Sequence, residues 1–560
     1  MDYYINKKKK KQNKTKALSF FLTLSFSLFL FSLYITSHHN PTPLHHVPTT
    51  LSGGGAAACP GIRRLDDYAA KCVYIKTHGG GCRSQGYFNY LEIFYCAGNA
   101  VFGYFVLATW LAVLFCFLGQ TASDYFCPSV GGLATVLKLP PTIAGTTLLP
   151  LGNGANDVFS SIISFGQSGS ADIGLNGVLG GAFFICCVVV GVVSVCVAPR
   201  AVTVDRTCFV RDVVFFLFVL CCLLVIIALG RITFWFALGF VSLYLFYIAL
   251  VSATEMIRYD CKVDSECGLG NPTAEDESIA DQRIPLLGDA GVLEIDNLKR
   301  RSWWSSVLRG VELLLDLPRM LTIPTTIESK WSKPITVASS TFAPILLVII
   351  YAAAPERDFR TSTPTLTAGI VAGLIFGTLT LAFTGASAPP AGVRRLPWLI
   401  GGFSMSIVWT YVVARELVSL LLAIGEVVGI SPAILGFTVL AWGNSVGDLV
   451  ADVAMAVKGG ADGAQVAVSG CYAGAVFNTV VGLGLSMVFA AYRSPAGIPR
   501  NAEVAETVAF LMAALVWALL VLPRRNMQLD RWLGGGLLVI YFCFLFLRLA
   551  KAVGLLHLPN

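Results

Sequence analysis

Two short stretches of closely similar sequence, Leu151-Gly152-Asn153-Gly154-Ala155-Asn156-Asp157 and Trp442-Gly443-Asn444-Ser445-Val446-Gly447-Asp448, lie in two separate hydrophobic segments of this chain. A shift of 291 positions superimposes them and also pairs identical residues upstream, from Pro141 on Pro432 to Leu149 on Leu440. Unrelated segments of this length would share about one identity, so the agreement indicates an internal duplication. An acidic side chain therefore recurs at equivalent positions of two apolar segments.

The composition is that of a polytopic membrane protein. Of the 560 residues, 55% are hydrophobic and only 13% are charged, and the mean hydropathy is +0.71. A soluble domain carries about 25% charged residues. The net charge of +7 does not indicate a nucleic-acid partner, because the Lys and Arg residues gather in particular loops, as membrane topology requires.

Apolar runs of about 20 residues, long enough to cross a hydrocarbon core of about 30 Å as helices, recur along the chain. They fall at 17–36, 91–118, 133–165, 174–198, 212–229, 232–252, 335–354, 366–384, 398–421, 430–457, 464–490, 503–522 and 532–550. We therefore predict an all-α membrane protein with about thirteen transmembrane helices.

The positive charges predict the orientation of these spans. The basic cluster from Lys7 to Lys16 keeps the amino terminus cytosolic, and alternation then places the other basic clusters in the cytosol as well. The span that holds Asp157 runs outward and the span that holds Asp448 runs inward, so the repeats are inverted. The first span is a signal anchor or a cleaved signal peptide, and neither alternative changes the remaining orientation.

Two segments outside the spans carry further predictions. Residues 37–90 are extracytosolic in this topology, so two disulfides are expected among Cys59, Cys72, Cys82 and Cys96, with the pairing open. Residues 253–334 are rich in polar residues and indicate a cytosolic loop rather than a folded domain. Cysteines within the apolar runs are expected to act as small packing residues; they are Cys116, Cys186, Cys187, Cys196, Cys221, Cys222 and Cys543.

Asp157 and Asp448 are the first candidates for function, because an ionisable side chain at bilayer depth costs several kcal/mol unless it faces a polar cavity. A bound cation is the simplest partner for each, since neither span offers a Lys or Arg that could neutralise its Asp; Lys138 lies about five helical turns from Asp157. Calcium takes about 6–8 oxygen ligands, often from two or more carboxylates, and neighbouring glycines let main-chain carbonyls turn inward. The predicted cation ligands are Asn153, Asn156, Asp157, Asn444, Ser445 and Asp448, with Ser160, Asp452 and Asn478 as secondary candidates.

Other interpretations of the two aspartates are weaker. If the glycines only permitted helix packing and each Asp bonded to nearby backbone, an acid within the membrane would still have to be explained in both repeats. A cation channel also uses acidic residues. An intramembrane diaspartyl protease would need a Tyr-Asp pair, which occurs only as Tyr259-Asp260 at the start of the loop, and no nucleotide-binding Gly-x-x-x-x-Gly-Lys-Ser/Thr motif is present. We therefore expect a transporter that is not an enzyme and needs no cofactor.

The two motifs, Gly152 to Ser160 and Gly443 to Asp448, resemble the paired alpha repeats of the calcium/cation antiporter superfamily, and most closely its plant cation/calcium exchangers. The resemblance implies an inverted-repeat sodium/calcium-exchanger-like fold and alternating access at a single site near the membrane midplane. It also implies exchange of Ca2+, or another divalent cation such as Mn2+, for Na+, K+ or H+; an H+-coupled K+/Na+ exchanger at the same site is the alternative. The family's ion-coordinating roles fall on Asn153, Asp157, Asn444, Ser445 and Asp448.

The resemblance also predicts the organisation of the chain. Five-helix repeats at 91–252 and 398–550 would form the exchanger core, while 1–36 and the two spans within 335–397 would be additions. Asp157 stands where many members carry Glu, which is one methylene longer, so the cavity is expected to differ in size. The expected partners are the lipid bilayer and inorganic cations, with no obligate protein partner, in a plasma, vacuolar or other endomembrane.

Overall fold

The computed structural model describes most of the 560-residue chain. The described residues are 62, 65, 67–77, 86–96, 99–137, 149–166, 171–200, 202–230, 233–267, 316–327, 331–352, 359–386, 388–458, 460–493 and 502–552. Eleven helices among them are long and apolar enough to cross a membrane. Extended pairing in these residues is limited to an isolated antiparallel bridge between Thr203 and Gln528, so the described fold is all-α.

Two of the thirteen predicted spans are not among those eleven. The run at 17–36 lies outside the described residues. The run at 133–165 is divided: its first residues end the helical run that begins at Ala100, residues 138–148 lie outside the described part, and a separate helix, α7, covers Leu149–Gly166. The prediction of one continuous span there was wrong because hydropathy averages over a helix end. α7 itself is less apolar than the other spans, since it carries two Asn, one Asp and three Ser.

The chain forms two compact units. The first unit consists of residues 1–116, 160–240 and 414–560, and the second of 117–159 and 241–413. Four helices pass from one unit to the other along the chain: α4 (Ala100–Thr121), α7, α11 (Phe234–Cys267) and α16 (Leu396–Val428).

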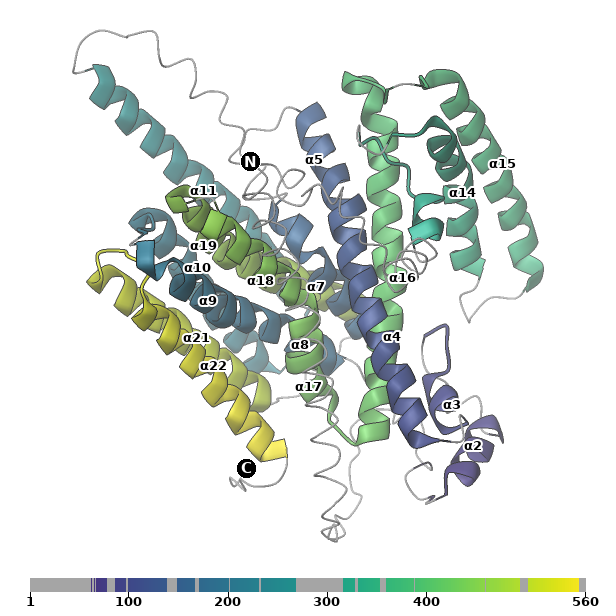
Figure 1. The fold of residues 1–560 in the computed structure, drawn as a ribbon, viewed down its shortest axis with the longest axis horizontal. Coiled ribbons are helices and arrows are strands. Elements are labelled where there is room, and N and C mark those ends of the chain that lie inside the picture. The colour runs from purple at the N-terminus through teal and green to yellow at the C-terminus, as the bar shows by residue number, and fades with distance from the viewer. Residues whose placement is uncertain are drawn as a thin grey trace, which may run out of the picture. The chain divides into compact units, whose positions relative to one another are not determined.

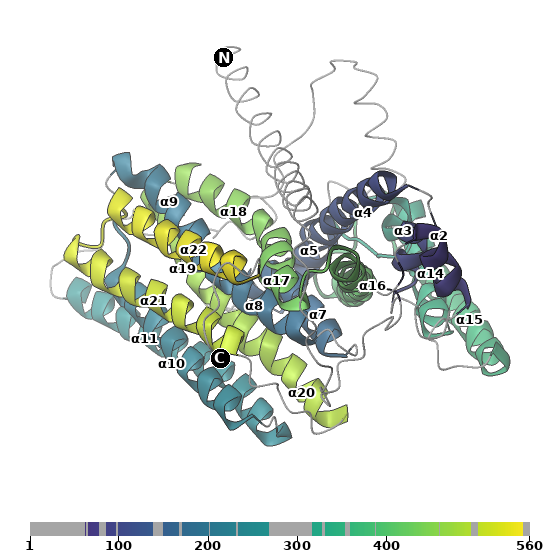
Figure 2. The same cartoon turned by 90° about the horizontal axis from the view of Figure 1, so that it is seen from below.

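The first unit holds most of both repeats. Its other elements are α2 (Tyr68–Thr77), α3 (Tyr90–Tyr95), α8 (Ala171–Phe184), η4 (Ile185–Val189), α9 (Val190–Val197), η5 (Ala198–Arg200), α10 (Arg206–Leu229), α17 (Pro432–Leu435), η9 (Gly436–Leu440), α18 (Ala441–Lys458), α19 (Gly460–Phe477), η10 (Asn478–Leu483), α20 (Gly484–Arg493), α21 (Ala502–Arg524) and α22 (Arg531–Ala552). Within it, α22 packs along α9 and α21, and α10 packs along α21 and α19 (Figures 1 and 2). All residues from Ile173 to Phe184 of α8 are buried, so α8 is a central helix of this unit.

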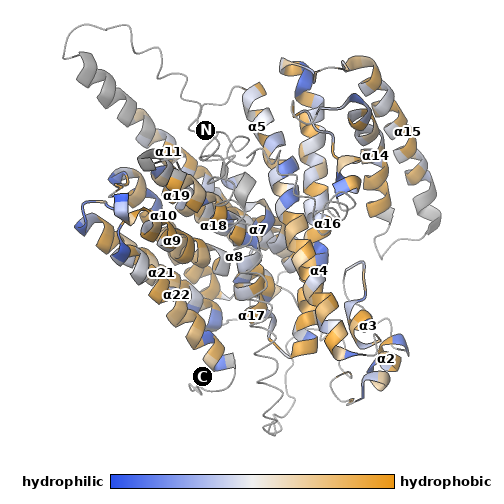
Figure 3. Ribbon diagram, in the orientation of Figure 1, coloured by the Kyte–Doolittle hydropathy of each residue, from blue (hydrophilic) through white to orange (hydrophobic). Residues whose placement is uncertain are grey.

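The second unit contains η2 (Ala122–Phe126), α5 (Cys127–Val136), α14 (Lys333–Ala352), α15 (Phe359–Phe383) and η8 (Gly392–Arg395). α14 and α15 pack closely as a pair and are apolar over most of their length (Figure 3). Glycines on α15 allow this approach, because a Cβ at Gly373 would lie 2.3 Å from the Thr341 carbonyl oxygen and one at Gly377 would lie 2.1 Å from the Thr341 hydroxyl.

Contacts between helix ends agree with the predicted alternation of spans. Val204 N donates to Met527 O at 2.9 Å, and Asp205 N donates to the Gln465 amide oxygen at 2.6 Å. The three chain segments that meet here are all on one side of the membrane in the predicted topology. That this side is the cytosol remains a prediction.

The structure refines two predicted boundaries. The span expected at 91–118 begins at Ala100, because Tyr90–Tyr95 is a separate helix followed by a disulfide between Cys96 and Cys72. Cys59 and Cys82 lie outside the described residues. α11 continues to Cys267, so the segment expected as a loop from residue 253 starts as helix.

Of the cysteines expected as packing residues, Cys186 and Cys187 are buried, Cys222 is partly exposed, and Cys116, Cys196, Cys221 and Cys543 are exposed on the apolar surface.

Candidate cation-binding site

The second copy of the repeated motif lies on α18, directly after the π-helical turn η9. Ser445, Asp448 and Asp452 are separated by three and four residues and therefore share one face of α18. Ser445 is fully buried, Asp452 is 8% exposed, and Asp448 and Asn444 are partly buried. This face combines two carboxylates with a hydroxyl in a membrane-spanning helix.

Asp452 has a protein partner on the neighbouring helix. The Cys471 thiol of α19 donates a hydrogen bond to Asp452 Oδ2 over 3.2 Å, and both side chains are buried. The corresponding position in the first repeat, Ser161, accepts a hydrogen bond from the Ser486 hydroxyl of α20 at 2.8 Å. The two repeats are therefore asymmetric at this position.

Glycines bring α8 and η9 into backbone contact next to the motif. A Cβ at Gly180 would lie 2.7 Å from Phe437 Cα, and a Cβ at Gly436 would lie 2.6 Å from the Ile173 carbonyl oxygen. The sequence requires glycine on both sides of this crossing, because any larger residue would separate the helices. This crossing holds η9, the turn that directly precedes α18, against α8.

π-Helical turns occur at equivalent places in the two repeats. η4 (Ile185–Val189) and η10 (Asn478–Leu483) directly follow α8 and α19, the third segments of their respective repeats, and a shift of 294 positions places Phe184 on Asn478. A π turn widens the helix and often marks a functional position. Asn478, a secondary candidate ligand, begins η10 and is 2% exposed.

The interior of the first unit contains buried oxygens whose hydrogen-bonding capacity the protein does not use. Within the described residues, four such atoms without a hydrogen-bond partner are Ser160 Oγ, Asn176 Oδ1, Ser445 Oγ and Thr479 Oγ1. An unsatisfied buried polar group costs about 1–3 kcal/mol. Neutral oxygens of this kind are the ligands that hard cations prefer, so the donor set fits a cation.

Asn176 and Thr479 were missed by the sequence-based prediction. Asn176 of α8 is fully buried, and its amide nitrogen donates to Asp172 O at 2.9 Å, which leaves the side-chain oxygen available. Thr479 of η10 is also fully buried. The sequence could have indicated Asn176, since an amide in the apolar run 174–198 needs a partner. Thr479, in contrast, cannot be distinguished in sequence from a packing threonine.

The first copy of the motif lies in the part of α7 that belongs to the second unit. Asn156 and Asp157 are 7% and 5% exposed, and Asn156 Oδ1 has no hydrogen-bond partner among the described residues. Ala155 packs in an apolar cluster with Phe126 and Val130, which holds this helix against η2 and α5. The side chain of Asn153 lies outside the described part of the structure.

Thus, the two aspartates lie on helices of duplicated segments, α7 and α18, each near buried neutral oxygens, and α18 is part of a helix long enough to span a membrane. Among the described residues, no group of three or more His, Cys, Asp or Glu side chains is arranged to hold a metal ion by itself. Duplicated halves with an acidic motif in each are typical of a secondary transporter.

The family pattern described as "Sodium/calcium exchanger protein" matches residues 107–253 and 398–550, and the chain belongs to this family. It is 44% identical to Cation/calcium exchanger 1 of Arabidopsis thaliana, over 97% of this chain and 98% of that protein. It is 41% identical to Cation/calcium exchanger 2 of the same plant, over 96% and 98%. The Mitochondrial sodium/calcium exchanger protein of Homo sapiens is 29% identical over 88% and 89%. A crystal structure of the H+/Ca2+ exchanger CAX aligns with a TM-score of 0.42 at 13% identity, covering 79% of this chain and 82% of that one.

Proposed function

We propose that this protein exchanges Ca2+, or another divalent cation such as Mn2+, for Na+, K+ or H+ by alternating access. Asp157 and Asp448 supply the negative charge, and Asn153, Asn156, Asn444 and Ser445 supply neutral oxygens. The observation that carries the proposal is the duplication of an acidic motif on two helices, α7 and α18; the predicted topology makes the two copies inverted. The names of the relatives, which include calcium exchangers, support the choice of cation.

Charge balance explains why transport is coupled exchange. Two carboxylates offset the charge of one divalent cation. When the cation has left, the empty carboxylates cannot cross the hydrocarbon interior without compensation, because isolated charges in that environment are costly. The carrier therefore returns with monovalent cations or protons bound, which makes it an antiporter.

Asn176 and Ser160 extend the proposed ligand set. Both side chains are buried in the first unit and present an oxygen without a hydrogen-bond partner within the described residues. Calcium needs more oxygens than the motif on α18 supplies. These two side chains are therefore assigned as additional neutral ligands.

The proposal is tested by uptake of calcium-45 into proteoliposomes that contain the purified protein, under imposed outward Na+, K+ or H+ gradients. We expect one gradient to drive uptake. Asp157→Asn and Asp448→Asn should each lower the rate at least about tenfold, since even outer-shell changes around metal ligands cost about 10- to 100-fold. Asp67→Asn makes the same chemical change at an exposed position before α2 and should leave the rate unchanged.

Two results would contradict the proposal. Uptake that ignores every gradient would indicate a channel. If no calcium enters but the gradients drive K+ or Na+ movement that both variants abolish, the protein is an H+-coupled monovalent-cation exchanger. Competition by Mn2+ in the same assay identifies the preferred divalent cation.

A further inference from the structure

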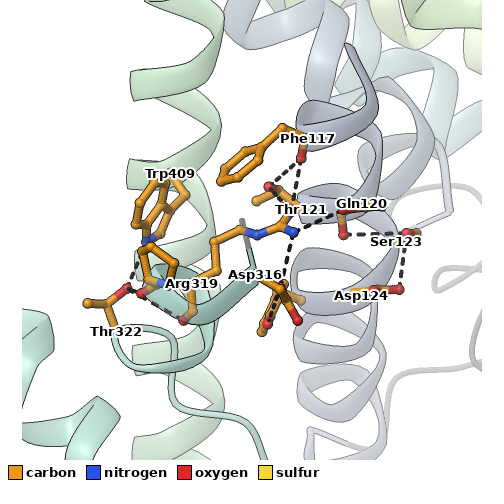
Figure 4. Close-up of polar contacts among 11 residues, drawn as sticks. Phe117, Gln120, Thr121, Ser123, Asp124, Asp316, Arg319, Thr322 and Trp409 are labelled. Atoms are coloured by element: carbon orange, nitrogen blue, oxygen red, sulfur yellow. Dashed lines mark hydrogen bonds and ion pairs between the residues drawn. The ribbon is translucent and has the colours of Figure 1, made fainter. Parts of the chain in front are cut away.

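A short segment at the end of the predicted cytosolic loop is embedded in the second unit. We call residues 316–327 the strap. Its Arg319 is 1% exposed, and its Nη1 donates to the Phe117 carbonyl and the Thr121 hydroxyl, both at 3.1 Å. Nη2 donates to the Gln120 amide oxygen at 3.0 Å, and the guanidinium lies 4.0 Å from the centre of the Phe117 ring (Figure 4).

The strap meets α4 at an irregular point of the helix. The π turn η2 begins at Ala122, one turn after Phe117. A π turn shifts the backbone hydrogen-bond ladder, and here the Phe117 carbonyl accepts from the Thr121 hydroxyl at 2.7 Å as well as from Arg319. Asp316 pairs with Arg319 at 3.0 Å and accepts from the Tyr125 hydroxyl, within η2, at 2.9 Å. The strap therefore contacts the end of α4 before the π turn and Tyr125 within it.

The same segment is fixed to α16. Trp409 Nε1 donates to the Thr322 hydroxyl at 2.8 Å. A Cβ at Gly402 would lie 2.4 Å from the Pro324 carbonyl oxygen, so glycine is required for this approach. Arg395 Nε, in η8 before α16, donates to the Thr326 hydroxyl at 2.8 Å. Thr322, Pro324 and Thr326 of the strap thus contact α16 or η8, the turn before it.

A continuous ring of contacts joins α4, α16 and the strap. Arg319 stacks on Phe117, the Phe117 and Trp409 rings are 5.8 Å apart, and Trp409 bonds to Thr322 of the strap (Figure 4). Packing alone does not explain a buried guanidinium here, because an apolar residue of similar size is often as stabilising. Arg instead provides directional donors that hold one helix in register with a neighbour.

We propose that the strap makes α4 and α16, the first helices of the two repeats, move as one body during the transport cycle, with Arg319 as the positioning residue. This inference rests on the proposed exchange function. It also gives the predicted cytosolic loop a direct mechanical connection to both repeats. None of the proposed cation ligands lies in the strap. Loss of the Arg319 contacts should therefore slow the conformational step without changing cation binding.

The test compares Arg319→Gln and Arg319→Lys with Arg394→Gln, an exposed arginine in η8. Exchange rates in proteoliposomes give the maximal rate per folded protein and the half-saturating Ca2+ concentration. We expect Arg319→Gln to lower the maximal rate about tenfold, as misplacement far from a reacting centre can, with half-saturation changed less than about twofold. Arg319→Lys keeps the charge but not the fork of donors, and should be intermediate.

Hydrogen–deuterium exchange on the same samples is the second measurement. Arg319 contacts α4 directly, so faster exchange in 117–126 alone would show only a local effect. The inference requires faster exchange also in 402–409 of α16, which Arg319 reaches through the strap. Unchanged exchange in 402–409, or an unchanged maximal rate per folded molecule, would overturn it. If the wild type shows no cation-driven exchange, the function proposal fails, while exchange in 402–409 still decides whether the strap couples the helices.

Discussion

Ser445 and Ser194 are both fully buried, but only one hydroxyl is satisfied within its own helix. Ser194 Oγ donates to Val190 O at 2.7 Å, whereas Ser445 Oγ has no hydrogen-bond partner among the described residues. If Ser445 binds the transported cation, Ser445→Ala should raise the half-saturating Ca2+ concentration about tenfold, as loss of roughly 1.4 kcal/mol implies. Calcium-dependent uptake measures this change.

Ser194→Ala is the matched control for Ser445→Ala. It removes the same atom at the same burial, so the half-saturating concentration should stay within about twofold of the wild type, a difference smaller than 1.4 kcal/mol. Equal effects of the two substitutions would show that Ser445 acts through packing alone.

The site prediction rested mainly on which residue types occur within the apolar runs. Asp157, Asp448 and their neighbouring amides were proposed as ligands from the repeat, because an acid in an apolar run demands a partner. The same logic applied to Asn176 but was not extended beyond the motifs. The Cys471–Asp452 hydrogen bond could not be predicted, since it depends on how α18 and α19 pack.

At the scale of elements, Gly180 determines the approach of α8 to η9. Gly180→Ala would place a methyl group 2.7 Å from Phe437 Cα, a backbone atom that cannot move aside independently. We expect a loss of about 1–3 kcal/mol of stability, typical of overpacking. The thermal unfolding midpoint of the detergent-solubilised protein measures it.

Gly535→Ala on α22 is the control, because nothing lies within 4 Å of its ideal Cβ. A surface substitution of this kind should stay within about 0.5 kcal/mol of the wild type. The proposed crossing would be wrong if Gly180→Ala were equally neutral.

A second element-scale contact connects the chain before α4 to α16 within the first unit. Glu416 is 4% exposed and accepts hydrogen bonds from Tyr87 N and the Tyr90 hydroxyl. Burial and the Glu416 carboxylate raise the pKa of Tyr90 above its usual value, so the phenol stays protonated and able to donate. Tyr90→Phe should cost about 1.5–3 kcal/mol, the range for a hydrogen bond to a charged group.

The unfolding midpoint again provides the measurement for Tyr90→Phe. Tyr492→Phe removes the same hydroxyl from a side chain that is 80% exposed and should have no measurable effect. Equal midpoints for both variants would show that the Glu416 contact does not stabilise the fold.

The lengths of the apolar runs predicted most of the long helices but could not locate their irregular turns. The π turns η2, η4, η9 and η10 depend on which carbonyls find partners in the folded protein. The strap was expected as part of a polar loop, because its contacts with α4 and α16 come from distant parts of the sequence. α7 was merged with the end of α5 because both are apolar overall.

At the scale of the whole molecule, the predicted topology places residues 37–90 outside the cytosol. The Cys72–Cys96 disulfide, with its Cα atoms 5.1 Å apart, fits that compartment. Peptide mapping of protein purified from membranes without reductant should recover the two cysteines in one cross-linked fragment. Recovery of both as free thiols would place the segment in the cytosol and reverse the predicted orientation of every span.

Composition and charge alternation determined the class of fold, since a 560-residue chain with 13% charged residues must be largely embedded in lipid. The internal repeat then indicated inverted halves, and the family match falls within the same two segments. The division into two compact units could not be predicted, because it separates single helices such as α7 into parts that pack in different surroundings.

The most direct test of the central claim is equilibrium binding of calcium-45 to the purified protein and to Asp157→Asn and Asp448→Asn. Our account predicts that either single substitution weakens binding at least about tenfold, because each repeat contributes a carboxylate that the transported cation requires. Wild-type affinity in either single variant would contradict it.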